Sequence, residues 1–272
     1  MTYWQGKSAL VLGASAGFGF VVSKELAAAG AHVTLVARDK SRLDDAVARI
    51  QQIATAAVYA ACADIASQDG MDKLITELPP AARRPDIVIH CVGRSTRGHV
   101  LETTPDEFDE FWRINFLSAV RVTRAFVPQL KQSRGHLVLV GSLASKLASR
   151  YLGAYPASKF PLAAYAQQLR LELAGSGMHV LLFCPGPIAR TDAGTRYDAA
   201  SANLPDSARA PAGGVKLGSA DPQRLARKLL RGCERRLPEI VVPAKARWLF
   251  AIAQLWPRVG DWLLTKLFTR QR

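Results

Sequence analysis

Residues 8–19 read Ser8-Ala9-Leu10-Val11-Leu12-Gly13-Ala14-Ser15-Ala16-Gly17-Phe18-Gly19. The apolar run Ser8–Leu12 that opens this stretch is too short for a helix and is typical of a buried parallel strand. Glycines then mark a tight turn, and apolar residues with helical spacing continue to Ala29, where Gly30 ends the pattern. The stretch therefore predicts a strand, a turn and a helix in direct succession.

The rest of the chain repeats this alternation. Strands are predicted over residues 33–36, 58–62, 87–92, 136–140, 180–183 and 240–242. Helices are predicted over residues 17–29, 39–53, 67–78, 105–130, 154–174 and 222–231, with Pro128 expected to end or bend the fourth. Such alternation predicts an α/β fold, a Rossmann-type doubly wound parallel sheet of about seven strands with helices on both faces.

One domain accounts for most of the chain. A doubly wound sheet reaches this length as a single unit, so we expect one catalytic domain over residues 1–242. Residues 243–272 are expected to add a helical extension that is not an independent domain. Between Pro185 and Ala220 periodicity is weak and small residues dominate, which predicts a long loop that acts as a lid over the substrate.

Cysteine usage and charge limit the class of protein. The chain has 272 residues, 4 cysteines and a formal net charge of +14. The cysteines are widely spaced, which argues against a zinc site or a disulfide framework and favours free thiols in the cytoplasm. No signal peptide is predicted at the N-terminus.

Positive charge is concentrated in the last quarter of the chain. Residues 207–272 hold 14 Lys or Arg against 4 Asp or Glu. Binding to a membrane surface, binding to a nucleic acid or merely a solvated basic face would account for this charge.

The glycine-rich turn has the spacing G-x-x-x-G-x-G between a strand and a helix. Gly13 permits the tight turn, Gly17 lets a pyrophosphate approach backbone N–H groups, and Gly19 allows the helix to pack closely on the strand. The helix N-terminus then faces phosphate. Glycines alone occur in many turns, but this context favours a dinucleotide site.

The residue after the second strand distinguishes the two nicotinamide cofactors. An acidic residue binds the ribose 2′-hydroxyl, whereas an arginine accommodates a 2′-phosphate. Arg38 stands at this position, which favours NADP(H) over NAD(H). Asp39 follows it, where a carboxylate is suited to cap the next helix.

Further motifs, in order along the chain, resemble the short-chain dehydrogenase/reductase family over about residues 7–242. They are Asp64-Ile65, Asn115, Ser142, Tyr155-x-x-x-Lys159 and Pro185-Gly186. The resemblance implies that Asp64 bonds the adenine, that Pro185-Gly186 contacts the nicotinamide carboxamide, and that the chain forms a homodimer or homotetramer through the helices around Asn115 and Tyr155. Together with the turn and Arg38, it implies cofactor contacts at Gly13, Ser15, Ala16, Gly17, Phe18, Gly19, Arg38, Asp64, Ile65, Gly93, Asn115, Tyr155, Lys159, Pro185, Gly186 and Ile188.

The candidate catalytic residues are Tyr155, Lys159, Ser142 and Asn115. Tyr155 and Lys159 are four positions apart on a predicted helix, which places both on one face. A tyrosine titrates near pH ~10, so acid–base work near neutrality needs a neighbouring positive charge. We expect Tyr155 to exchange a proton with the substrate oxygen, Ser142 to position that oxygen, and Asn115 to support a water that links Lys159 to solvent. Each residue alone also has an ordinary structural explanation.

Several positions depart from the family pattern. His90-Cys91-Val92-Gly93 replaces the usual Asn-Asn-Ala-Gly, and a histidine at a strand end is more often structural than catalytic. Pro161 removes an N–H and is expected to bend the catalytic helix. Thr191 lies one position later than the usual threonine, which puts its cofactor contact in doubt.

The extension combines Trp, Leu and Phe with Lys and Arg, and its apolar run is interrupted by Pro257 and Arg258. It is far shorter than the roughly 20 apolar residues that cross a bilayer. Two short helices are expected, which either lie in a membrane interface or cover the substrate pocket or a subunit interface.

These observations predict an oxidoreductase that uses NADP(H) to reduce a ketone or aldehyde, or to oxidise the alcohol, on a hydrophobic small-molecule substrate. The alternative is a non-catalytic NADP(H)-binding sensor or a membrane-associated interaction protein, against which the complete set of four catalytic candidates argues. Nucleic-acid binding rests on basic charge alone and is not favoured. No metal site is expected.

Overall fold

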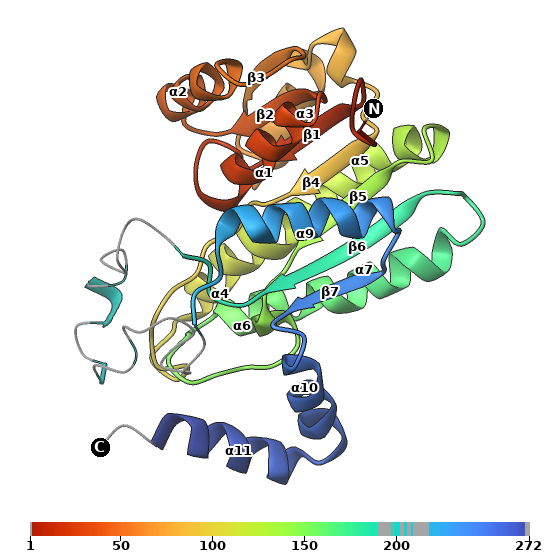
Figure 1. Cartoon of the computed structure of the whole chain (residues 1–272). Helices are drawn as coiled ribbons and strands as arrows, with labels where there is room; N and C mark the ends of the chain where they lie inside the picture. Colours follow the sequence, from red (N-terminus) through yellow and green to blue (C-terminus); the bar gives the residue numbers. More distant parts are fainter. Residues whose placement is uncertain are drawn as a thin grey trace.

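The structure is a computed structural model that describes residues 2–189, 197, 199–201, 204–205, 208 and 218–269. Its centre is a seven-stranded parallel sheet with the order β3-β2-β1-β4-β5-β6-β7 (Figure 1). The strands are β1 (Ser8–Leu12), β2 (His32–Ala37), β3 (Val58–Cys62), β4 (Ile87–His90), β5 (His136–Val140), β6 (His179–Pro185) and β7 (Glu239–Val242). The predicted doubly wound sheet is confirmed, and the order reverses between β1 and β4, where such sheets bind ligands.

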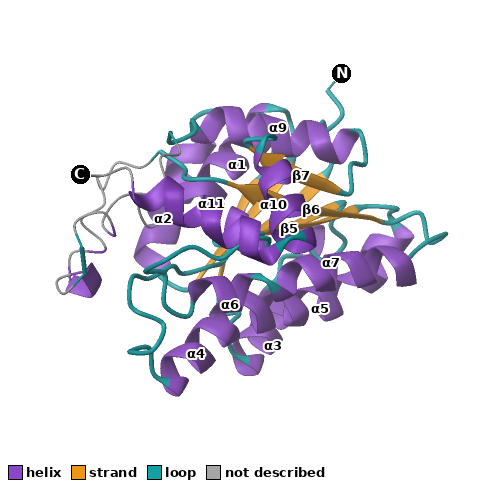
Figure 2. Cartoon of the chain, turned by 90° about the horizontal axis from the view of Figure 1, so that it is seen from below, coloured by secondary structure: helices purple, strands orange, loops and turns teal. Residues whose placement is uncertain are grey.

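Helices pack on both faces of the sheet (Figures 1 and 2). The helices are α1 (Gly17–Ala28), α2 (Lys40–Gln51), α3 (Gln68–Glu77), α4 (Pro105–Trp112), α5 (Ser118–Gln132), α6 (Tyr155–Lys159), α7 (Pro161–Glu172), α9 (Pro222–Glu234), α10 (Ala246–Leu255) and α11 (Pro257–Thr269). Leu26, Leu43 and Leu229 bring α1, α2 and α9 into one core. The opposite core contains Leu74 of α3 and Val122 of α5. Burial of these two apolar layers holds the strand ends in fixed positions.

The predicted helix over residues 105–130 differs from the observed structure in two ways. It begins at α4, where Thr104 and Glu107 form a capping box, and then passes through a π-helical turn, Arg113–Leu117, before α5. Pro128 does not end it, because α5 continues to Gln132. The buried side chains of Phe126 and Leu130 flank the proline, and their packing outweighs the hydrogen bond that the proline removes.

The catalytic helix was expected as one bent helix over residues 154–174, and the structure divides it into α6 and α7. The division falls at Phe160, directly before Pro161, and Phe160 keeps helical dihedral angles (φ −54°, ψ −43°). Helical backbone therefore continues across the division, and Pro161 stands at the first position of α7, a position that prolines commonly occupy.

Two histidines meet at the amino end of the sheet, the end opposite the glycine-rich turn. His136 opens β5 and His179 opens β6, and their Nδ1 atoms lie 2.9 Å apart. His179 Nε2 lies 2.9 Å from the carbonyl oxygen of Leu237, and His136 Nε2 lies 2.8 Å from the hydroxyl of Tyr3. The rings thus connect the N-terminal segment, two strands and the segment before β7.

The predicted extension forms α10 and α11, which lie across the carboxyl end of the sheet (Figures 1 and 2). None of the helices among the described residues is long and apolar enough to cross a membrane. The two helices approach closely, since a Cβ on Gly260 would meet the Cα of Ala253 at 2.6 Å. Most of the predicted lid, including Thr191, falls outside the described residues.

Candidate active site

A cleft of about 1310 Å³ opens at the carboxyl ends of the strands. It is lined by the glycine-rich turn, by the ends of β2 to β6 and by parts of α6, α10 and α11. Of the residues predicted for the site, the cleft-lining ones are Gly13, Ser15, Ala16, Gly17, Phe18, Gly19, Arg38, Asp64, Ile65, Gly93, Ser142, Tyr155, Lys159, Pro185, Gly186 and Ile188. Asn115 is fully buried behind this wall. The fold thus brings the whole predicted set to one place.

The glycine-rich turn leaves room for a phosphate at the N-terminus of α1. Gly17 has a φ of +59°, and a Cβ there would meet nothing within 4 Å, so the backbone is open to the cleft. Gly19 serves a different purpose, because a Cβ there would collide with the carbonyl oxygen of Gly13. Ala16 caps α1 without a side-chain hydrogen bond. The first N–H groups of the helix are therefore suited to hold an anion.

Two arginines line the cleft beyond the end of β2. Arg38 follows the strand and Arg42 lies one turn into α2. The Asp39 carboxylate accepts a hydrogen bond from the backbone N–H of Arg42 at 3.0 Å, so it caps α2 as its sequence position indicated. The same carboxylate lies 3.6 Å from Arg42 Nε, so Asp39 both caps α2 and pairs with the Arg42 guanidinium.

On the neighbouring strand end, Asp64 accepts a hydrogen bond from the backbone N–H of Ala66 at 3.0 Å. Its carboxylate lines the cleft beside Ile65. This turn leaves Asp64 with further acceptor capacity towards the cleft.

Asn115 ties the loop after β4 to the catalytic helix. It lies in the π-helical turn, where its Oδ1 accepts from the backbone N–H of Arg94 at 2.7 Å. Its Nδ2 donates to the carbonyl of Arg94 at 2.9 Å and to Ser158 Oγ at 2.8 Å. The local widening of the helix places this amide where a regular helix would turn it away.

Lys159 reaches the cleft through the space beside Gly93. Its Nζ donates to the carbonyl oxygen of Val140 at 3.2 Å. A Cβ on Gly93 would stand 2.9 Å from that Nζ and 3.1 Å from Asn115 Oδ1. Any larger residue at position 93 would therefore displace the amine.

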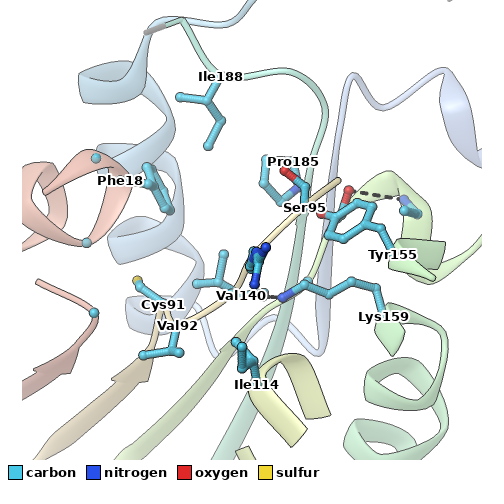
Figure 3. Close-up of a pocket in the computed structure, with 18 of the residues that line it drawn as sticks. Phe18, Cys91, Val92, Ser95, Ile114, Val140, Tyr155, Lys159, Pro185 and Ile188 are labelled. Carbon is cyan, nitrogen blue, oxygen red and sulfur yellow. Dashed lines mark hydrogen bonds between the residues drawn. The ribbon is translucent and has the colours of Figure 1, made fainter. Parts of the chain in front are cut away.

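Tyr155 and Lys159 both project into the cleft from α6 (Figure 3). Burial raises the pKa of Tyr155 to about 12, and a side-chain hydrogen bond with Ser142 acts in the opposite direction. Burial lowers the pKa of Lys159 to about 8. Ser142 Oγ is itself held by the backbone N–H of Ala144, which donates to it at 3.1 Å. The arrangement can hold a neutral phenol, a cationic amine and a hydroxyl around one substrate oxygen.

His90, a departure from the family pattern, is fully buried and does not line the cleft. Its Nε2 lies 2.8 Å from Ser118 Oγ, and Ser118 donates its own proton to the carbonyl of Ile114. His90 Nε2 is therefore the donor, and Nδ1 has no hydrogen-bond partner among the described residues. Burial lowers the pKa of His90 to about 3, so the ring is neutral and structural.

The substrate end of the cleft includes residues that sequence reasoning missed. Apolar side chains dominate it, and they are Leu143, Leu147, Leu152, Leu249, Phe250 and Leu264. Arg97 is a buried cation in this wall, its Nε donating to the carbonyl of Ala208 at 2.7 Å and its guanidinium 4.0 Å from the ring of Tyr197. No motif marked these residues individually, because segments far apart in the sequence build this wall. Covering the substrate pocket was one of the alternatives expected for the extension, which carries Leu249, Phe250 and Leu264.

Comparisons with known proteins agree with this geometry. The sequence profile of the short chain dehydrogenase family matches residues 7–201. A dehydrogenase/reductase SDR family member 7B of Danio rerio is 27% identical over 267 residues, which cover 93% of this chain and 82% of that protein. A fatty acyl-CoA reductase of Acinetobacter baylyi is 34% identical over 173 residues, 62% of this chain and 58% of that protein.

Among solved structures, L-sorbose reductase from Gluconobacter frateurii, in complex with NADPH and L-sorbose, superposes with a TM-score of 0.76. It is 22% identical, and the match covers 87% of this chain and 95% of that one. This likeness establishes the fold.

Proposed function

The chain belongs to the short-chain dehydrogenase/reductase family, and we propose that within it the chain is an NADPH-dependent reductase of ketones or aldehydes with a largely apolar substrate. Members of this family are NAD(P)-dependent oxidoreductases that act on carbonyl or alcohol groups. The observation that carries the proposal is the convergence of Tyr155, Lys159 and Ser142 on one cleft beside an apolar wall.

The four candidate residues divide the chemistry among them. The dinucleotide, held by the glycine-rich turn and the strand ends, supplies the hydride when it is bound. Tyr155, which burial keeps protonated, donates its proton to the substrate oxygen. Ser142 positions that oxygen by a hydrogen bond. The Lys159 cation favours transfer of the phenolic proton, and Asn115 orders the backbone behind it.

The preference for NADP(H) rests on Arg38 and Arg42. Both line the cleft, and Asp39 caps α2 and pairs with Arg42, an ion pair that a bound 2′-phosphate would compete with. Two guanidinium groups match a doubly charged 2′-phosphate better than a neutral hydroxyl. The NADPH complex of L-sorbose reductase is consistent with this preference.

An apolar substrate is proposed from the wall of the cleft. Leu147, Leu249 and Phe250 present hydrocarbon to the space beyond the catalytic hydroxyls, and burial of a matching chain would stabilise binding. The fatty acyl-CoA reductase similar to this chain acts, by its name, on a fatty acyl-CoA, which carries an apolar acyl chain.

The extension is proposed to belong to the catalytic unit rather than to form a domain of its own. Phe250 of α10 is a member of the core under α3 and α5. A homodimer or homotetramer through the helices around Asn115 and Tyr155 is also proposed, because Trp112 of α4 and Leu171 of α7 expose apolar surface there. Residence in the cytoplasm stays a prediction.

The test is a kinetic comparison with NADPH and a panel of ketones and aldehydes of increasing chain length. We expect turnover that improves with chain length and that is lost in Tyr155→Phe by about a thousandfold, with NADPH binding retained. Absence of turnover across the panel, or full activity in Tyr155→Phe, would defeat the proposal. Tight NADPH binding without turnover would instead support a cofactor-binding sensor.

A further inference from the structure

The two C-terminal helices expose large apolar side chains to solvent. Trp248 is 76% exposed, Leu255 67% and Trp262 53%. Trp256 and Val259 at the bend between the helices are also exposed. We refer to these five residues as the aromatic face. Positions 248 and 255 lie on one side of α10, and positions 259 and 262 on one side of α11, because three to four residues make a helical turn.

Cations surround the aromatic face. Lys245, Arg247, Arg258 and Lys266 are exposed, and the only acidic residue of the sequence from 243 to 272 is Asp261. Lys266 Nζ lies 4.1 Å from the centre of the Trp262 ring. Tryptophans and leucines among basic residues are typical of helices in the interface of a bilayer that contains anionic lipid.

The opposite sides of the same helices line the cleft. Leu249 and Phe250 of α10 and Leu264 of α11 contribute to the apolar wall near the catalytic residues. Each helix therefore separates the cleft from the aromatic face by its own diameter only, about 10 Å. An apolar molecule at the aromatic face would be adjacent to the mouth of the cleft.

We propose that the aromatic face lies in the interface of a membrane containing anionic lipid and that the substrate is a long-chain carbonyl lipid taken into the cleft from that membrane. The proposal rests on the proposed reductase function. Charge complementarity selects this occupant, because a second copy of the chain would bring Arg247 and Arg258 against like charges, whereas anionic headgroups neutralise them. Neither helix needs to cross the bilayer, since an interfacial helix buries only its apolar side.

The first experiment measures binding to vesicles of phosphatidylcholine alone and of phosphatidylcholine mixed with phosphatidylglycerol. We expect the whole chain to sediment with the anionic vesicles, with at least about tenfold weaker binding to the neutral ones and weaker binding at high salt. Trp248→Ser with Trp262→Ser should reduce binding by about tenfold or more. Ile75→Ser, which removes an exposed apolar residue from α3 on another side of the molecule, is the matched control and should change nothing.

The second experiment separates this inference from the proposed function. Neither Trp248 nor Trp262 lines the cleft, so the double variant should reduce a short water-soluble ketone at the wild-type rate. It should lose about tenfold in turnover of a long-chain ketone presented in anionic vesicles. If both ketones were reduced and neither the vesicles nor the double substitution changed the rate, the membrane inference alone would be overturned. If neither ketone were reduced, the proposed reductase function would be overturned.

Sedimentation equilibrium of the same proteins tests the competing occupant. The double variant and the wild type should have the same oligomeric state, as the aromatic face is not used between copies. Dissociation of a wild-type dimer in the double variant, with no vesicle binding by either, would assign this face to a subunit interface and overturn the proposal.

Discussion

Burial moves the pKa values of the two central residues in opposite directions, since it disfavours the charged form of each. The pKa of Tyr155 rises to about 12 and that of Lys159 falls to about 8. At neutral pH the phenol is therefore uncharged and the amine is cationic. A protonated phenol is the form that donates a proton, which suits reduction of a carbonyl better than oxidation of an alcohol.

The first prediction concerns the pH dependence of reduction. Lys159 loses its charge as the pH rises through about 8, so kcat/KM for reduction should be constant below that pH and decline above it. Lys159→Arg keeps a cation at all accessible pH values, so its lower activity should not show this decline. Rates measured over the range with one ketone check this, and a wild-type profile that stays level well above pH 8 would contradict it.

The second prediction concerns the choice of cofactor. Arg38→Ala and Arg42→Ala should each raise KM for NADPH by about tenfold, because a charge-assisted hydrogen bond contributes about 1.5 kcal/mol. KM for NADH should hardly change. Arg49→Ala removes a cation from the far end of α2, where Arg49 lies over the Phe20 ring, and is the matched control. An equal rise in KM for NADPH and for NADH would show that the arginines do not bind the 2′-phosphate.

At the scale of elements, three local features of the helices determine the site. The π-helical turn sets Asn115, the division before Pro161 ends the short helix that carries Tyr155 and Lys159, and the close approach of Gly260 to Ala253 sets α11 on α10. The π-helical turn departs from a regular helix, whereas the contact between Gly260 and Ala253 joins two regular helices.

The third prediction tests the contact between α10 and α11. Gly260→Val should force the helices apart, since even a Cβ would stand 2.6 Å from the Ala253 Cα. Overpacking of this kind costs about 1–3 kcal/mol locally. We expect KM for an apolar ketone to rise several-fold while NADPH affinity, measured by fluorescence, is unchanged.

Gly218→Ala is the control for this variant, because a Cβ there would meet nothing within 4 Å. It should leave both constants as in the wild type. If Gly260→Val behaved identically to Gly218→Ala, α11 would have no part in forming the substrate end of the cleft.

At the scale of the whole molecule, stability is linked to buried neutral histidines. Burial lowers the pKa values of His90 and His136 to about 3. Both groups bind protons more readily in the unfolded chain, so stability is present above the ordinary histidine pKa of 6.5 and is lost as the pH falls towards 3.

The fourth prediction is the size of this acid sensitivity. Between pH 6.5 and about pH 5, each histidine should reduce the free energy of unfolding by about 2 kcal/mol. His90→Gln places an amide N–H near the position of Nε2, so it retains a donor for Ser118, and it should flatten the pH dependence by about that amount. Urea unfolding at several pH values measures both proteins, and identical slopes would refute the assignment of His90.

The sequence predicted the strands correctly where a local pattern of apolar and turn residues determines the structure. The limits of β1, β3 and β5 matched those expected, because each is a continuous apolar run bounded by turn residues. The catalytic role of the candidates stays a prediction, but Ser142, Tyr155 and Lys159 line one cleft, because the fold brings together the end of β5 and one turn of α6. Asp39 was correctly read as a helix cap.

The rest depended on contacts between distant segments. Pro128 was expected to end or bend its helix, and α5 instead continues past it because buried neighbours hold that helix in place. No motif singled out Arg42 or Arg97, and only the folded chain brings them to the cleft. The sequence did not decide whether the extension covers the pocket or contacts a membrane. Helical periodicity separates an apolar side from a polar side, but it does not identify what the apolar side contacts.

The ring pair at the amino end of the sheet has one allowed direction of hydrogen bonding. The Leu237 carbonyl can only accept, so His179 Nε2 donates to it, and the Nδ1 of that neutral ring must accept from His136 Nδ1. His136 Nε2 then accepts the Tyr3 hydroxyl proton. The Leu237 carbonyl therefore determines the direction of the Tyr3 hydroxyl proton, more than two hundred positions earlier in the chain. Each hydrogen bond in the series fixes which atom donates in the next one.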